Sequence, residues 1–373
     1  MHRRRTFGLA LAATALAAGT GAASPTPLPT SSPTPTASAT QSDGTLQILT
    51  YRGYAEGGGV SPRFNWIGDF EKETGCRIAK IDTVQTAEEM IAQFGSRPYD
   101  LVSAGPALAG DLVATKRVQP IDPAKVDGYE DLDKRLRDLT TVSGKVYGVP
   151  YLWGYHEFVY DPARVRGELK EAFSSGRAAL RNSPMTIADA ALAAGEGGDD
   201  PFALTGGQLD GAVKLLEGAR ERTYWTNPIE LVKGFATGSL DYAQVTPYYR
   251  VLLQDAGQRI ATVPARRVTG WADSWMLGAG VPDTTCAYRW LSWMSAPGTQ
   301  RDAAVWVGLA PAGAKACKGR AREVCRAYGV GDAKRLSRVA FAERPPADCE
   351  EAQDGGCPGY DVWAGRWSKL ATK

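Results

Sequence analysis

The sequence predicts an α/β protein built as two lobes with largely parallel sheets. Its 373 residues are more than one hydrophobic core usually supports, so we expect two lobes. Short apolar strands alternate with amphipathic helices along the chain, which is the pattern of strand–helix–strand units. The formal charge is +2, and basic residues beyond the first few gather only in pairs such as Arg266-Arg267. Because phosphate backbones require a concentrated basic face, we expect no nucleic-acid partner.

The first 23 residues have the composition of a signal peptide. Met1–Arg5 is basic, Phe7–Ala18 is mostly Leu and Ala, and Gly21–Ala23 supplies the small residues that a signal peptidase accepts. The apolar run is too short to span a bilayer, which takes about 20 residues. Residues 24–44, which are rich in Pro, Ser and Thr, read as a flexible linker. We therefore expect export to the periplasm or the outer side of the cell envelope.

Two details of this segment bear on how the protein is exported and held. Arg4-Arg5-Thr6-Phe7 is similar to a twin-arginine signal, so both that route and the general secretory route stay open. Gly19 stands where a lipoprotein signal would carry its acylated cysteine. Because no thiol is available there, we expect the protein to lack that lipid anchor.

Six cysteines fit an oxidising compartment, where an even number predicts disulfides rather than free thiols. We expect two local bridges and one at long range, namely Cys317–Cys325, Cys349–Cys357 and Cys76–Cys286. The cysteines do not form CxxC pairs, and the only histidines are His2 and His156. A zinc site is therefore not predicted, and neither is any other metal or cofactor.

Local signals place the first elements of the chain. Leu46–Leu49 alternates as a strand does, and Ser61-Pro62 has the chemistry of a helix start, with Gly75 ending that helix. A strand is expected over Arg77–Ile81. Strand and helix then continue to alternate, as a parallel sheet requires.

The next elements follow the same pattern. Thr86 and Glu89 are spaced as a capping box that opens a helix, and Tyr99–Ser103 is predicted as a strand. Tyr147–Gly154 is an extended segment expected to leave the first lobe, and a helix is expected over Gly207–Arg222.

These elements divide the chain between two lobes that each use two stretches of sequence. Lobe I is expected to comprise residues 45–148 and 270–312. Lobe II is expected to comprise residues 149–269 and 313–373.

Catalysis by a histidine-based triad is not favoured by the sequence. His156 is the only histidine after the expected signal peptide, and no GxSxG motif accompanies it. Carboxylate chemistry of the glycosidase type requires only Asp and Glu, which are plentiful. We therefore predict a protein that is not an enzyme and keep a secreted hydrolase as an alternative.

Aromatic residues and one aspartate fall where loops of the two lobes are expected to converge. Tyr51 and Tyr54 follow the first strand, Trp153 lies on the segment between the lobes, and Trp271 and Asp273 lie where the chain returns. In open α/β sheets, ligands bind outside the carboxyl ends of the strands. Aromatic faces attract an ammonium group and a carboxylate neutralises it. The pattern predicts a site for a small cation.

Five stretches together resemble one family. They are Phe70–Gly75, Tyr99–Val102, Tyr147–Gly154, Gly270–Ser274 and Ala296-Pro297. In this order and spacing they are similar to the spermidine/putrescine-binding family of ABC-transporter substrate-binding proteins, and the likeness extends over nearly all of the expected mature chain.

The resemblance implies the type II periplasmic-binding-protein fold, with two α/β lobes that close on a ligand by hinge rotation. It also implies a monomer that passes a small amine, such as a polyamine, to a membrane permease. The residues that it assigns to the ligand, together with Trp153, are Tyr51, Tyr54, Ser103, Asp189, Tyr248, Trp271 and Asp273. Among them, Trp271 is expected to stack on the ligand and Asp273 to bind an amino group.

Some positions depart from the family pattern. Tyr51 stands where polyamine binders commonly have tryptophan, and Arg266-Arg267 stand where a glutamate is usual. The adjacent phenols of Tyr248-Tyr249 are hard ligands that suit a ferric ion. A carrier of ferric ion or of an anionic ligand on the same fold therefore remains a second interpretation.

Overall fold

The computed structural model describes residues 44–371, apart from residues 199, 220, 282–284 and 344–356. The predicted signal peptide and the linker up to residue 43 therefore lie outside the described residues. Within the described part of the chain, no helix is both long enough and apolar enough to cross a membrane.

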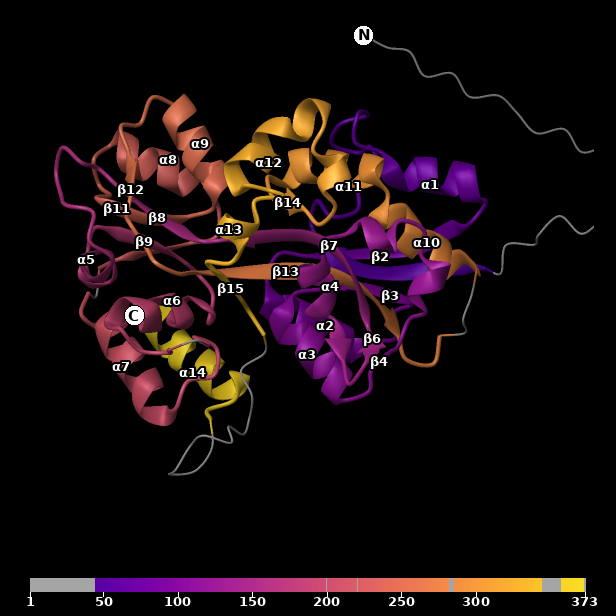
Figure 1. Ribbon diagram of the computed structural model, residues 1–373, viewed down its shortest axis with the longest axis horizontal. Coiled ribbons are helices and arrows are strands. Elements are labelled where there is room, and N and C mark those ends of the chain that lie inside the picture. Colours follow the sequence, from indigo (N-terminus) through magenta and orange to yellow (C-terminus); the bar gives the residue numbers. More distant parts are fainter. Residues whose placement is uncertain (1–43, 199, 220, 282–284, 344–356, 372–373) are drawn as a thin grey trace, which may run out of the picture. The chain divides into compact units, whose positions relative to one another are not determined.

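The larger sheet of the described residues has eight strands and mixes both strand orientations (Figure 1). Its strands are β1 (Thr45–Tyr51), β2 (Arg77–Val84), β3 (Leu101–Ala104), β4 (Val118–Gln119), β7 (Gly148–Tyr155), β13 (Val268–Gly278), β14 (Ala310–Pro311) and β15 (Val339–Phe341). The hydrogen-bonded order is β14-β7-β13-β3-β1-β2, and β4 and β15 also pair with β13. β2 and β3 run parallel to β1, whereas β3, β4 and β7 run antiparallel to β13.

The smaller sheet has five strands within the described residues and is also mixed. Its strands are β8 (Glu157–Tyr160), β9 (Ala178–Arg181), β10 (Thr223–Trp225), β11 (Tyr242–Val245) and β12 (Ala261–Thr262). The order is β10-β9-β11-β8-β12. β10 and β11 run parallel to β9, so their carboxyl ends meet at one edge, while β8 runs antiparallel to β11.

Two stretches of chain join the sheets. β7 is followed directly by β8, with only His156 between them, and β12 leads to β13 through residues 263–267. In Figure 1 the long strands β7 and β13 run side by side toward the smaller sheet. The predicted extended exit from lobe I is confirmed, and so is the two-lobe α/β class. The sheets are mixed because the chain crosses and returns along antiparallel strands.

Helices cover both faces of the two sheets. They are α1 (Trp66–Thr74), α2 (Ala87–Ser96), α3 (Pro106–Ala114), α4 (Lys134–Asp138), α5 (Leu169–Ser174), α6 (Thr186–Ala194), α7 (Gly206–Glu217), α8 (Ile229–Ala236), α9 (Pro247–Asp255), α10 (Thr285–Ser295), α11 (Pro297–Val307), α12 (Arg322–Tyr328), α13 (Ala333–Leu336) and α14 (Tyr360–Ala371). A short hairpin and four 3₁₀ turns complete the described elements, namely β5 (Thr141–Val142), β6 (Lys145–Val146), η1 (Pro123–Lys125), η2 (Tyr129–Asp131), η3 (Ala314–Ala316) and η4 (Gly319–Ala321).

Neighbouring strand residues enter different cores because side chains alternate between the faces of a sheet. In β1, Ile48 packs with α1 and α10, whereas Leu49 packs with α2 and α3. Figure 1 shows α2 and α3 on one side of the larger sheet and α1 and α11 on the other. In β8, Phe158 likewise packs with α5, α6, α7 and α14, and Val159 packs with α8 and α9.

The first helix begins later than the sequence predicts. Ser61-Pro62 lies in a turn region, and α1 starts at Trp66 with Asn65 as its N-cap, whose side chain accepts a hydrogen bond from the Gly68 N–H. An asparagine caps as well as a serine. Gly75 ends the helix in the left-handed conformation at φ 72°, as predicted.

Other local predictions are close to the structure. Thr86 caps α2 by accepting from the Glu89 N–H, while the Glu89 carboxylate accepts from the Gln85 N–H rather than completing the box with Thr86. The helix predicted over Gly207–Arg222 ends sooner, at Glu217.

The chain after β14 is shared between the two sheets. Val324, Tyr328 and Leu336 pack into a core of the larger sheet, whereas Trp363 and Trp367 of α14 pack into a core of the smaller one. The predicted lobe boundaries, which give all of residues 313–373 to lobe II, stay a prediction.

Two of the three predicted disulfides are confirmed. Cys76–Cys286 joins the start of β2 to α10 across 210 residues, and Cys317–Cys325 closes a loop of 8 residues. Cys349, the predicted partner of Cys357, lies outside the described residues.

Candidate ligand site around Asp273

A buried carboxylate on β13 is the centre of the candidate site. Asp273 is 3% exposed, and its Oδ2 accepts a hydrogen bond from the hydroxyl of Tyr54. Tyr54 follows β1, and its backbone carbonyl accepts from the Tyr151 hydroxyl at 3.0 Å and from the Trp66 indole at 3.3 Å. The loop after β1 is thereby fixed so that the Tyr54 hydroxyl reaches Asp273.

Burial raises the pKa of Asp273 to about 6, well above the ordinary range of a carboxyl. The hydrogen bond from Tyr54, the charge of Arg181 and a hydrogen bond from Trp271 act in the opposite direction. Burial also raises the pKa of Tyr54, and the charge of Asp273 adds to that effect. Near neutral pH the phenol therefore keeps its proton, and Asp273 carries the negative charge.

Tyr51 lies beside this pair. Its ring meets that of Tyr54 edge to face, with the centroids 5.4 Å apart. A Cβ atom at Gly105 would lie 2.9 Å from Asp273 Oδ1 and 3.3 Å from the Tyr51 hydroxyl oxygen. Glycine at the start of α3 is thus required for both side chains to approach its backbone.

Ser103 supports this arrangement from within the sheet. Its hydroxyl lies 2.7 Å from that of Thr50 and accepts a hydrogen bond from the Tyr51 N–H at 3.3 Å. The side chain is fully buried. Ser103, which the resemblance assigns to the ligand, holds the backbone of Tyr51 in place here.

Trp271 lies two residues before Asp273 on β13 and therefore projects from the same face of the strand. Its partly buried ring is 4.9 Å from the ring of His156. The guanidinium carbon of Arg181 lies 4.9 Å from the Trp271 ring centroid. A cation from lobe II thus stacks on the tryptophan that the resemblance assigns to the ligand.

We call Tyr51, Tyr54, Arg181, Trp271 and Asp273 the Asp273 cluster. It offers three aromatic surfaces, one buried carboxylate and one guanidinium. The sequence reasoning missed Arg181. The signal was present, because Arg181 ends the apolar strand β9 just before a turn, and the carboxyl ends of parallel strands form the ligand edge of such sheets.

Asp189, also assigned to the ligand by the resemblance, is already bound by the protein. It lies in the first turn of α6 and is 4% exposed. Its Oδ2 accepts from the Gln244 side-chain amide at 2.7 Å, and its Oδ1 accepts from the Thr269 hydroxyl at 2.6 Å. The Nδ1 atom of His156 lies 3.5 Å from Oδ2. These donors come from both sheets, so Asp189 links the lobes where the chain crosses.

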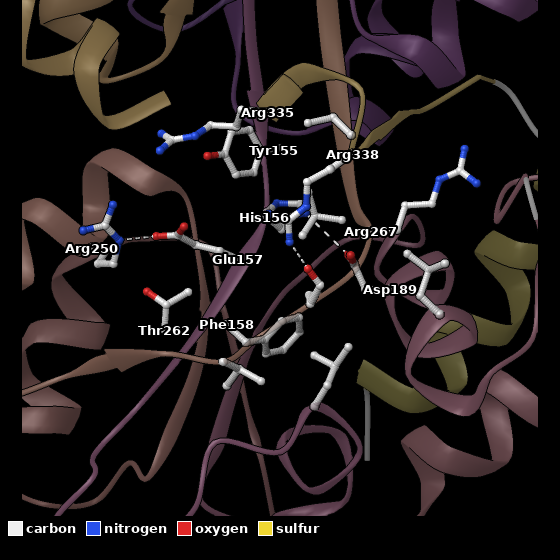
Figure 2. Close-up of a pocket in the computed structure, with 16 residues that line it drawn as sticks. Tyr155, His156, Glu157, Phe158, Asp189, Arg250, Thr262, Arg267, Arg335 and Arg338 are labelled. Carbon is white, nitrogen blue, oxygen red and sulfur yellow. Dashed lines mark hydrogen bonds and ion pairs between the residues drawn. The ribbon is translucent and has the colours of Figure 1, made fainter. Parts of the chain in front are cut away.

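A cavity of about 290 Å³ opens next to this crossing (Figure 2). Figure 2 shows His156 and Asp189 facing each other at its wall, and Arg250 paired with Glu157. Three further arginines line it, namely Arg267, Arg335 and Arg338. Arg335 and Arg338 are exposed and donate to backbone carbonyls, so much of this positive charge is solvated or already satisfied.

The structure does not bring Trp153 or Tyr248 into the Asp273 cluster. Trp153 is 2% exposed, donates its indole N–H to the Pro311 carbonyl and packs against Tyr155 and Tyr328. Tyr248 is partly buried and packs against the core of the larger sheet.

The adjacent tyrosines of α9 do not converge. The Tyr249 ring packs on Trp225 in a core of the smaller sheet, at 6.1 Å between centroids, whereas Tyr248 belongs to a different core. Burial raises the pKa of both phenols, which disfavours the phenolate that ferric ion would need. Within the described residues, no group of His, Cys, Asp and Glu is placed to hold a metal ion.

Comparison with known families gives one match over most of the chain. The profile of a family described as bacterial extracellular solute-binding protein matches residues 65–319. The putrescine-binding periplasmic protein SpuD of Pseudomonas aeruginosa is 26% identical over 115 residues. That stretch covers 28% of this chain and 31% of the relative, so the match spans about a third of that protein.

Solved structures show the same fold over nearly the whole described chain. The spermidine/putrescine ABC transporter substrate-binding protein PotD of Streptococcus pneumoniae superposes with a TM-score of 0.64 at 16% identity, covering 88% of this chain and 97% of that one. The periplasmic binding protein MotA of A. tumefaciens, solved with glucopine, gives 0.61 at 17% identity, covering 87% and 99%. The resemblance predicted from the sequence is confirmed.

Proposed function

Because the chain belongs to the family of bacterial extracellular solute-binding proteins, we propose that it captures a small amine between its two lobes and delivers it to an ABC importer. It acts outside the cytoplasm, as the family does, and disulfides such as Cys76–Cys286 are stable in that compartment. We propose that it acts as a monomer that meets a membrane permease.

The observation that carries the proposal is the buried carboxylate of Asp273 among aromatic rings. A charged carboxylate in a dry site is costly unless an opposite charge meets it, and an ammonium group supplies that charge. The rings of Tyr51 and Tyr54 attract a cation further and bury its methylene groups, whereas Trp271 already stacks with the Arg181 guanidinium. The names of the relatives agree with an amine, since SpuD is a putrescine-binding protein and PotD belongs to spermidine and putrescine transport.

A ligand-binding screen tests this function. We expect putrescine or spermidine to raise the melting temperature, whereas 1,4-butanediol, which has the length of putrescine without its charges, does not. A ligand at a hundred times its dissociation constant stabilises by about 2.7 kcal/mol. Small-angle scattering should show a smaller radius of gyration with the same ligand, because the lobes close on it.

The same samples separate the carrier from the alternatives. The bound amine should be recovered unchanged after long incubation. Turnover of a glycoside or ester panel would instead favour a hydrolase. Stabilisation by ferric ion or phosphate with no response to any amine-bearing compound would favour the other carriers on this fold.

A further inference from the structure

Arg181 is held in the candidate site by its backbone as well as its side chain. Its N–H donates to the Gln244 side-chain oxygen at 2.9 Å, and its carbonyl accepts from the Thr186 hydroxyl at 2.9 Å. The guanidinium then lies over the Trp271 ring. Stacking leaves the N–H edge of a guanidinium available to a ligand, because the ring contacts only its face.

Within the described residues, no carboxylate forms an ion pair with this guanidinium. Among the described residues, Arg181 forms no side-chain hydrogen bond or ion pair, although it is partly buried. Arg250, which is also partly buried, is by contrast paired with Glu157. The charge of Arg181 nevertheless acts on the cluster, because it lowers the pKa of Asp273 and opposes the rise in the pKa of Tyr51.

The second carboxylate that the resemblance assigns to the ligand is engaged elsewhere, and Glu88, whose charge also reaches Tyr51, is exposed and accepts from the Tyr360 hydroxyl. Asp189 already accepts hydrogen bonds from Gln244 and Thr269. The Asp273 cluster therefore presents one negative group, Asp273, and one positive group, Arg181. A diamine would meet one attractive and one repulsive charge, whereas a molecule with one amino group and one carboxylate would meet two attractive charges.

We propose that Arg181 is a carboxylate-binding subsite and that the ligand is zwitterionic, with its amino group on Asp273 and its carboxylate on Arg181. The proposal rests on the proposed function and narrows its substrate class from amines to amino acids and related compounds. A planar carboxylate matches the fork of donors on a guanidinium, and such charge-assisted pairs are stronger than neutral hydrogen bonds. Stacking on Trp271 fixes the orientation of the fork before the ligand arrives.

Titration calorimetry with matched ligands tests the assignment. A series of ω-amino acids is compared with diamines of the same chain length, such as 4-aminobutanoate with putrescine. We expect an ω-amino acid to bind at least tenfold more tightly than its diamine. Arg181→Gln should weaken binding of that amino acid by about ten- to a hundredfold, the range for hydrogen bonds to charged groups, and leave the diamine unchanged or tighter.

A charge-matched control and a second variant separate the outcomes. Arg77→Gln removes an equal charge from an exposed residue paired with Glu71 and should leave both affinities unchanged. Asp273→Asn should weaken both ligands. If Arg181→Gln binds the amino acid as tightly as the parent does, Arg181 is not a carboxylate-binding subsite. Amine binding at Asp273 would still stand. If no amine-bearing probe binds the parent protein, the proposed function fails and the subsite fails with it.

Discussion

The hydroxyl of Tyr54 donates a hydrogen bond to the carboxylate of Asp273 across a separation of 219 residues. One partner follows the first strand of the chain, and the other lies on the strand by which the chain returns from the smaller sheet. The pair therefore forms only when β13 has joined β3 and β1 in the larger sheet. The charge that the ligand is expected to meet depends on this contact.

Removing the charge of Asp273 separates binding from stability. Asp273→Asn keeps the shape of the side chain, and the affinity for an amine ligand should drop by about ten- to a hundredfold. The ligand-free variant should be more stable than the parent at pH 7.5, by up to about 3 kcal/mol, because the burial cost disappears. Calorimetry and urea denaturation measure the two effects. Asp69→Asn on the exposed face of α1 is the control, and an unchanged amine affinity of Asp273→Asn would contradict the site.

Amine binding should depend on pH through Asp273. Its pKa is about 6, so affinity should be constant above that pH and decrease by up to tenfold per unit below it. The stability of the ligand-free protein changes with pH in the direction opposite to the amine affinity. The folded state holds this proton more tightly than the unfolded state does, so the Asp273 contribution to the free energy of unfolding rises as pH falls from 6 toward 3.8. Amine-binding titrations of the parent and of Asp273→Asn between pH 5 and pH 8 isolate the effect. Identical profiles of affinity against pH for the two proteins would refute it.

A methyl group at position 105 should disturb the site without removing a binding group. The Cβ of Gly105→Ala would lie 2.9 Å from Asp273 Oδ1, so the carboxylate or α3 must move. Overpacking of this kind costs about 1–3 kcal/mol, and we expect a loss of that size in stability together with weaker amine binding. Gly59→Ala enters open space and is the matched control. Thermal denaturation and calorimetry on the two variants make the comparison.

Asp189 should matter for the fold more than for the ligand. Asp189→Ala leaves the buried donors of Gln244 and Thr269 without an acceptor, which should lower the free energy of unfolding by about 2–4 kcal/mol. Amine affinity of the folded variant should stay within a few-fold of the parent. A loss of affinity as large as that of Asp273→Asn would place Asp189 in the ligand site after all.

The two described disulfides should contribute unequally to stability. The chain-entropy estimate gives about 5 kcal/mol for the long loop of Cys76–Cys286 and about 2.5 kcal/mol for the short loop of Cys317–Cys325. Replacing each pair by serine and measuring urea denaturation gives the two values. Mass mapping of the oxidised protein should also find Cys349–Cys357, and a free thiol at Cys349 would contradict that third pairing.

Much of the fold could be predicted because its signals are local. The alternation of Leu46–Leu49 lies within β1, Gly75 ends α1, and Thr86 caps α2. The predicted start of α1 was wrong. Ser61-Pro62 and Asn65 both have the chemistry of a helix start, and only the burial of Trp66 and Phe70 in the core distinguishes between them.

The site could be predicted only in part, because the role of each residue depends on which side chains from other strands and helices face it. Trp153 and Trp271 both lie on crossing strands, yet the first faces the core and the second faces Arg181. Asp189 has the expected charge, but its donors come from β11 and β13. Nothing near these residues in the sequence reveals which face or which partner each one takes.

The last helix has a consequence for the order in which the protein matures. α14 supplies Trp363, Trp367 and Leu370 to a core of the smaller sheet, although every strand of that sheet lies between residues 157 and 262. A polypeptide is made from its amino end, so the part of this face that α14 covers stays open until well after the last strand, β12, has been made. An exported chain that crosses a membrane unfolded meets the same delay. On that route the core of the smaller sheet is complete only after α14 has followed the strands across the membrane.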